Sequence, residues 1–295
     1  MFLLKIMALR SILSIFVKTT IILTKGMERK GNVKGHRNII LISIVMILLQ
    51  FEAKSQENIY TDRPTQTTSS AIVPVGAFQI ETGFYLSEFT NTNMTGATDK
   101  LQFYSLNNLL LRYGVSDRFE LRFNHEISKV RQVIDGSVAF SNSPIFAPTS
   151  FGFKYNISKG NSKLPDIGIV TSFGGGIFEE TGNGLQSEIR LAIDGNLTDE
   201  LTISSNLGIS LANKFESAIP LYTLVLGHGI NDRLGVFVEA YGSFPEGGAN
   251  THAMDAGLTF LVNSSLQLDV YGGTGISSNS ANLLIGFGLS KRFFK

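Results

Sequence analysis

From residue 77 onward, apolar and polar residues alternate with a period of two, and this pattern limits the possible folds more than any other feature. Residues 119–123, for example, read Phe-Glu-Leu-Arg-Phe. Successive side chains of a β-strand point to opposite faces of a sheet, so each such run predicts a strand with one apolar and one polar face. No stretch of comparable length has the period of an amphipathic helix. The body of the chain is therefore predicted to be all-β.

Twelve runs of this kind can be counted, which is an even number. Each is about ten residues long, enough for a tilted strand to cross a bilayer. The runs lie near residues 77–87, 101–113, 118–127, 149–157, 166–174, 186–197, 201–211, 220–230, 234–243, 252–261, 266–275 and 281–293.

The connections between the runs alternate in length. Those after the second, sixth, eighth and tenth runs are short turns, and most of those after odd-numbered runs are longer. Outer-membrane barrels have short periplasmic turns and longer external loops. We therefore predict a 12-stranded antiparallel transmembrane β-barrel over residues 77–295, rather than a soluble β-sandwich, which would also alternate. The longer connections are expected at residues 88–100, 128–148, 175–185, 212–219, 244–251 and 276–280.

The N-terminal part of the chain has the pattern of an export signal. Residues 39–49 are apolar and follow several basic residues. This run is too short for a membrane-spanning helix, which needs about 20 residues, but suits the core of a signal peptide. The small residues Ala53 and Ser55 predict cleavage before Gln56, so residues 27–55 are interpreted as a signal peptide.

A second apolar stretch precedes this signal. Residues 1–26 are apolar but are interrupted by Lys5, Arg10 and Lys18. Translation from Met27 would give a signal peptide of ordinary length, so we interpret residues 1–26 as a non-native N-terminal extension. The alternative is a charged, marginal second membrane segment.

Composition excludes several classes of function. The chain contains no cysteine, which excludes disulfides and thiolate metal sites. Residues 1–55 hold nine of the 25 basic and two of the 24 acidic residues, so the remainder has a net charge of −6. An acidic body argues against a nucleic-acid partner. The histidines after residue 55 lie in no nucleophile motif, and no acidic or histidine cluster has metal-ligand spacing, so we expect no enzyme activity, no metal and no cofactor.

The polar faces of the predicted strands supply the candidate functional residues, because they would line the lumen of a barrel. Their charges have two interpretations: a selective pathway for solutes, or a lattice of salt bridges that fills a narrow barrel. The candidates are Glu81, Arg112, Glu120, Arg122, Glu126, Lys154, Glu188, Arg190, Asp194, Glu239, Asp255 and Asp269.

Residues 56–76 precede the first predicted strand and do not alternate. They are rich in Thr and Ser and contain Asp62, Arg63 and Pro64. One interpretation is a plug or lid, with Asp62 and Arg63 bonded inside the barrel. The other is a flexible periplasmic lead-in.

The last predicted strand alternates toward Phe293, which is the form of a signal for the barrel-assembly machinery. The strand departs from the common form of this signal, because Phe294 and Lys295 follow the aromatic residue. The other partners expected for such a chain are outer-membrane lipid and a small-molecule solute.

Three stretches resemble a known family. Residues 61–67 read Thr-Asp-Arg-Pro-Thr-Gln-Thr, residues 76–83 read Gly-Ala-Phe-Gln-Ile-Glu-Thr-Gly, and residues 111–122 read Leu-Arg-Tyr-Gly-Val-Ser-Asp-Arg-Phe-Glu-Leu-Arg. They resemble the transporter-like outer-membrane family named for the meta-cleavage pathway of phenol degradation, whereas the later half matches only in its barrel pattern. The resemblance implies a Gram-negative outer-membrane channel for small compounds, including aromatic or other hydrophobic ones.

Two hypotheses about function follow. The first is a passive channel whose selectivity is set by lumen charges and by residues 128–148 and 175–185. The second is a non-conducting barrel that serves as a structural element or binds a partner.

Overall fold

The structure is a computed structural model that describes residues 58–92, 96–146, 149–160, 164–175, 185–212 and 215–294. The predicted signal peptide and the predicted non-native extension lie outside the described residues. No helix within these ranges is long and apolar enough to span a bilayer.

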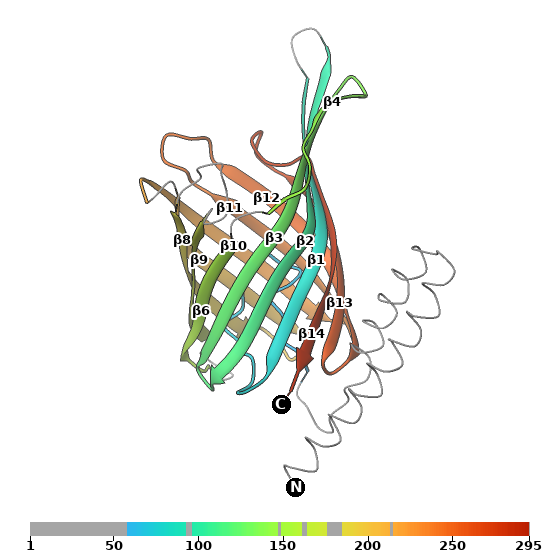
Figure 1. The fold of residues 1–295 in the computed structure, drawn as a ribbon. Coiled ribbons are helices and arrows are strands. Elements are labelled where there is room, and N and C mark those ends of the chain that lie inside the picture. Colours follow the sequence, from blue (N-terminus) through green and yellow to red (C-terminus); the bar gives the residue numbers. More distant parts are fainter. Residues whose placement is uncertain are drawn as a thin grey trace, which may run out of the picture. The chain divides into compact units, whose positions relative to one another are not determined.

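The described residues form a sheet of twelve long strands and two short ones (Figure 1). The strands are β1 (Phe78–Thr92), β2 (Thr98–Ser116), β3 (Phe119–Ile134), β4 (Ser137–Ser141), β5 (Ile145–Phe146), β6 (Thr149–Ser158), β7 (Asp166–Gly175), β8 (Leu185–Asn196), β9 (Leu201–Ala212), β10 (Ser217–Gly229), β11 (Leu234–Ser243), β12 (Thr251–Asn263), β13 (Leu266–Gly275) and β14 (Leu283–Phe293).

The twelve long strands form a closed antiparallel barrel, as predicted. Each pairs with its neighbours along the chain, with β6 beside β3 because β4 and β5 are short additions to β3. The first and last strands also pair, so that Phe84 lies opposite Phe287. Because the barrel is closed, no strand edge is left with unpaired backbone N–H and C=O groups, for which lipid offers no hydrogen-bond partner.

The two faces of the barrel differ in the way that the alternation predicts. In β11, Val238 points outward and is 55% exposed, whereas its neighbour Glu239 points into the lumen and is 3% exposed. In β13, Leu268 points outward and Asp269 inward in the same way. An apolar outer face and a polar lumen are what a transmembrane barrel requires.

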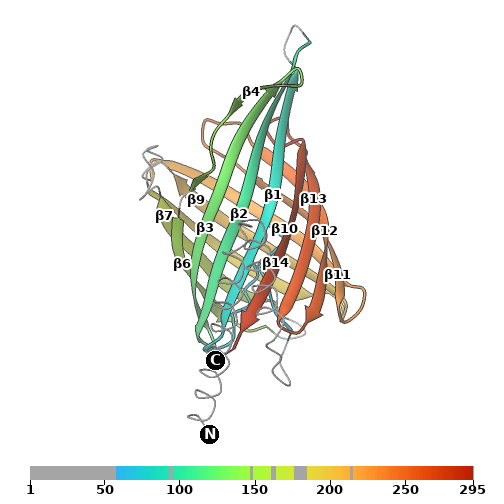
Figure 2. The same cartoon turned by 45° about the vertical axis from the view of Figure 1, so that its right-hand side comes forward.

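The predicted loops at 88–100 and 128–148 are wrong in part. Strands β1, β2 and β3 continue through much of these ranges and extend past the neighbouring strands (Figure 2). Pairs such as Asp99 with Ile134 hold this extension together. The sequence rule stopped each strand where its outward face ceases to be apolar, but a strand that has left the lipid no longer needs an apolar face.

The short turns give the barrel its orientation. They lie at the same end as Phe293 and the C-terminus, and the extension of β1–β3 lies at the other end (Figure 1). Because barrels of this type keep their termini and short turns in the periplasm, we call the end near Phe293 periplasmic and the opposite end external.

Candidate functional site in the barrel lumen

Residues 58–76, here called the lumen segment, enter the barrel from its periplasmic end. Hydrogen bonds join the segment to side chains that point inward from strands around the barrel. These strands are β1, β2, β3, β6, β8, β9, β10, β11 and β13.

Asp62 lies at the centre of a buried cluster of cations. Its carboxylate is 2.5 Å from Nη1 of Arg122 and 3.0 Å from Nζ of Lys154. Arg112 is also close, at 3.6 Å. Burial alone would raise the pKa of Asp62, but the charges of Arg112, Lys154 and Arg122 outweigh it and hold the pKa well below its usual range. Asp62 is therefore ionised and fixes the start of the segment to β2, β3 and β6.

Arg112 connects the wall of the barrel to the segment. Its guanidinium is fully buried and lies 2.8 Å from Glu81 and 2.7 Å from Glu120. It also donates hydrogen bonds to the backbone carbonyls of Tyr60 and Ala71. The five N–H donors of an arginine are held in a rigid, planar arrangement. Those of Arg112 bind carboxylates of two strands, β1 and β3, and two backbone carbonyls of the lumen segment.

Arg63 lies in a space that two glycines leave open. Gly83 of β1 and Gly288 of β14 are paired across the closing seam. A Cβ atom at either glycine would come within 2.3 Å of the Arg63 guanidinium. The same guanidinium is 3.1 Å from Asp269. Sequence reasoning missed both glycines, although Gly83 belongs to one of the three motifs.

Carboxylates on the opposite wall bind the middle of the segment through its backbone. Glu239 accepts hydrogen bonds from the N–H of Gln66 at 2.8 Å and of Thr67 at 2.7 Å, and a third from the Thr67 hydroxyl. Asp194 accepts from the N–H of Ser70. A carboxylate that accepts N–H bonds replaces the water that the backbone lost on entering the lumen.

The remaining predicted lumen residues have fewer contacts with the segment. Glu188 pairs with Arg190 at 2.6 Å, and Arg190 also donates to the carbonyl of Gln66. Glu126 accepts a hydrogen bond from the Tyr85 hydroxyl. Asp255 is 5% exposed, and its carboxylate makes no hydrogen bond or ion pair within the part of the chain that the structure describes.

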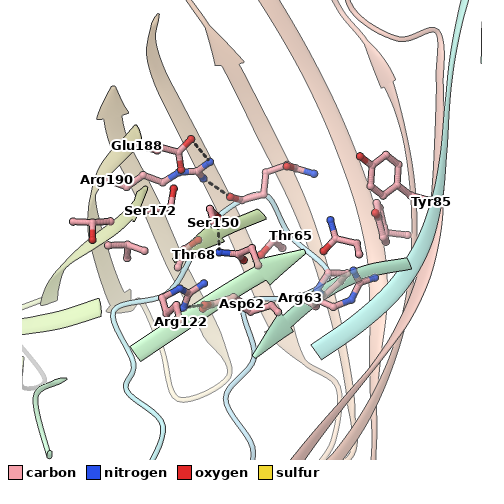
Figure 3. A pocket seen from close by; sticks show the side chains of 18 residues that line it. Asp62, Arg63, Thr65, Thr68, Tyr85, Arg122, Ser150, Ser172, Glu188 and Arg190 are labelled. Atoms are coloured by element: carbon pink, nitrogen blue, oxygen red, sulfur yellow. Dashed lines mark hydrogen bonds and ion pairs between the residues drawn. The ribbon is translucent and has the colours of Figure 1, made fainter. Parts of the chain in front are cut away.

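A polar pocket lies on the external side of the segment (Figure 3). It has a volume of about 350 Å³. Polar side chains of β3, β6, β7 and β8 form one wall, and Tyr85 and Tyr271 lie on the other. Its floor is the lumen segment. The labelled polar lining is Asp62, Arg63, Thr65, Thr68, Arg122, Ser150, Ser172, Glu188 and Arg190.

A second, more apolar pocket of about 240 Å³ lies nearer the external end, lined by Phe89, Tyr241, Ala253 and Leu284 among others. Tyr241 and Leu284 belong to a cluster of inward-facing apolar side chains on one wall of the lumen. The cluster consists of Tyr85, Val225, Phe237, Tyr241, Tyr271 and Leu284.

A third pocket, of about 290 Å³, lies on the periplasmic side of the segment, against β10 and β11. Arg63, Pro64 and Thr65 line both this pocket and the polar pocket. These three residues therefore form the partition between the external and periplasmic parts of the lumen. The Arg63–Pro64 peptide bond is cis.

Two histidines of the barrel contact hydroxyl groups of other strands. His125 contacts the Thr149 hydroxyl and His252 contacts the Tyr222 hydroxyl. Among the described residues, no group of three or more His, Cys, Asp or Glu could hold a metal ion.

Comparisons with known proteins agree on the fold. An outer membrane channel from Pseudomonas putida F1 is similar with a TM-score of 0.58 and 12% identity, over 78% of this chain and 100% of that chain. The translocator domain of the autotransporter NalP from Neisseria meningitidis is similar with a TM-score of 0.50 and 10% identity, over 88% and 96%. No curated protein matches the sequence. The fold is thus that of an outer-membrane β-barrel.

The sequence itself gives a more specific relation. Residues 61–293 match the family model described as "Putative MetA-pathway of phenol degradation". The match begins at the Thr-Asp-Arg-Pro stretch of the lumen segment and ends at the last residue of β14, so it includes both the partition and the barrel. The chain belongs to this family.

Proposed function

We propose that the protein is an outer-membrane channel for small amphipathic compounds, and that the lumen segment closes it at rest. The observation that carries this proposal is the partition at Arg63, Pro64 and Thr65, which lies between two pockets of the same lumen. A barrel that serves only as an anchor needs no pockets on both sides of a segment in its lumen. Movement of these three residues would join the pockets into one path.

The two walls of the external part support a solute with an apolar face and a polar face. The apolar pocket is larger than the roughly 150 Å³ cavity that suffices for a benzene ring. Tyr85 and Tyr271 line the next pocket together with arginine, carboxylate and hydroxyl groups. A single-ring aromatic compound that carries a polar group matches both the apolar pocket and the polar pocket next to it. We propose such compounds as solutes.

Two amino acids of similar size give a test of this solute class. In liposome swelling, L-phenylalanine should enter several times faster than L-glutamine, because both carry the same backbone charges and only phenylalanine has a ring for the apolar pocket. Replacing two pocket residues, Tyr241→Ser with Leu284→Ser, should bring the two rates close together.

The outcomes of this assay separate the hypotheses. Equal rates for the two solutes in the unaltered protein would contradict the proposed solute class but not the channel. Absence of swelling with either solute, also from a chain that begins at residue 71 and so lacks the partition, would instead favour a non-conducting barrel. A variant with Leu268→Ser on the outward face of β13 serves as a control, and its ratio of rates should equal that of the unaltered protein.

We also propose that β14 carries the signal for the barrel-assembly machinery. Its last residues alternate up to Phe293. Because β14 pairs with β1 to close the barrel, recognition of this strand would couple assembly to closure. We propose no catalytic role for the chain.

A further inference from the structure

The outward faces of β1, β2 and β3 change from apolar to polar over two adjacent rows of paired residues. The register pairs their outward residues into rows that run across the three strands. From the membrane outward, these rows are Leu86, Tyr104 and Lys129; then Glu88, Gln102 and Arg131; then Thr90, Lys100 and Val133.

The level of this change coincides with the external rim of the barrel. Glu88 pairs with Leu283, which is the first residue of β14. Below this point Phe84 and Leu86 of β1 and Ile285 and Phe287 of β14 face outward, and the rings of Phe84 and Phe287 stack with their centroids 5.5 Å apart. Above it, β1–β3 continue without β14 (Figure 2). The polar rows therefore lie where the outer leaflet meets water.

These rows carry an excess of positive charge, here called the basic patch (Lys100, Lys129 and Arg131). Glu88 is the only acid in them, and it lies 2.9 Å from Nζ of Lys100. The side chains of Lys129 and Arg131 make no hydrogen bond or ion pair within the ranges that the structure describes. Two cations on the lipid side of the barrel are thus left for a partner.

We propose that the basic patch binds the phosphate groups of the phosphorylated glycolipid that forms the outer leaflet. Side chains two apart on a strand lie roughly 7 Å from each other, so Lys129 and Arg131 can hold one phosphate between them. Arginine binds phosphate through its planar fork and lysine as a point charge. The apolar rows directly below meet the acyl chains of the same lipid.

The position of the basic patch favours a lipid phosphate over a free anion as its ligand. It lies on the outside of the wall, whereas the solute pockets lie in the lumen, so an anion passing through the channel would not meet it. The inward residues at the same height, Asp99 and Gln132, bond to each other and do not contribute to the patch. The inference is independent of the proposed channel activity.

Binding of lipid A by the purified mature protein in nonionic detergent tests this proposal. The variant Lys129→Gln with Arg131→Gln should bind bisphosphorylated lipid A about thirtyfold more weakly than the unaltered protein, because each cation near an anionic lipid surface contributes about 1 kcal/mol and about 1.4 kcal/mol is tenfold. Lipid A without phosphates should bind the unaltered protein as weakly as bisphosphorylated lipid A binds the double variant. Heat-modifiability on gels checks that the variant is folded.

The matched control removes the same charge at the periplasmic end. Arg118→Gln with Lys159→Gln, both at exposed positions near the short turns, should leave lipid A binding unchanged. Equal binding by the two double variants would overturn the proposal, and so would equal binding of lipid A with and without phosphates. Displacement of lipid A by inorganic phosphate at equal concentration would show a site for free anions and would also overturn it.

Discussion

Replacing Arg112 by methionine should lower the free energy of unfolding of the barrel by about 3 kcal/mol, since removal of one partner of a buried ion pair costs roughly 3–5 kcal/mol. Arg112 is fully buried between Glu81 and Glu120. Without Arg112, the two buried carboxylates lose the positive charge that lies between them. We expect the lower end of the range because Arg122 still lies 3.0 Å from Glu120.

Urea unfolding in lipid vesicles, followed by circular dichroism, measures this effect. Arg118→Met provides the control, because Arg118 lies exposed at the turn between β2 and β3 and substitutions at such positions usually change stability by less than about 0.5 kcal/mol. If Arg112→Met and Arg118→Met unfold at the same urea concentration, the buried network does not stabilise the barrel as described.

Replacing Glu239 by alanine should raise the population of open channels at least tenfold. Glu239 binds the segment through two backbone N–H groups and one hydroxyl, all within two residues of the partition. Hydrogen bonds to charged groups contribute roughly 1.5–3 kcal/mol each, and about 1.4 kcal/mol is already a factor of ten. Glu239 has no cation partner within 4.0 Å among the described residues, so its removal leaves no buried charge unpaired.

Asp255→Ala is a closely matched control for this prediction. Asp255 lies directly opposite Glu239 on β12 and also faces the lumen, but it does not bind the segment. Open probability in planar bilayers should rise for Glu239→Ala and stay unchanged for Asp255→Ala. An equal rise in both variants would mean that lumen charge, and not the attachment of the segment, controls opening.

The barrel could be predicted from the sequence because lipid imposes a simple rule. Every strand that crosses the membrane needs an apolar outer face, so Val238 and Glu239 or Leu268 and Asp269 show the two faces without knowledge of any contact. Residues of a strand that lie beyond the membrane do not need an apolar outer face. For this reason the alternation missed the extension of β1–β3, where Glu88 and Lys100 face outward and bind each other.

The attachment of the lumen segment was less accessible to sequence reasoning. Its residues have no periodicity, and carboxylates such as Glu239 bind its backbone N–H groups, which every residue type offers. The place of Arg63 depends on the absence of side chains at Gly83 and Gly288, which are 205 positions apart in sequence and meet only because the barrel closes. Their proximity could be predicted only from the pairing register of the first and last strands.

The central claim is that the lumen segment closes a channel, and single-channel conductance of a shortened protein tests it most directly. A chain that begins at residue 71 lacks Asp62 and the partition at Arg63, Pro64 and Thr65 but keeps every strand of the barrel that the structure describes. Refolded into planar bilayers, it should show conductance steps several times larger and longer than those of a chain that begins at residue 56. Steps of the same size and duration in both proteins would contradict the account.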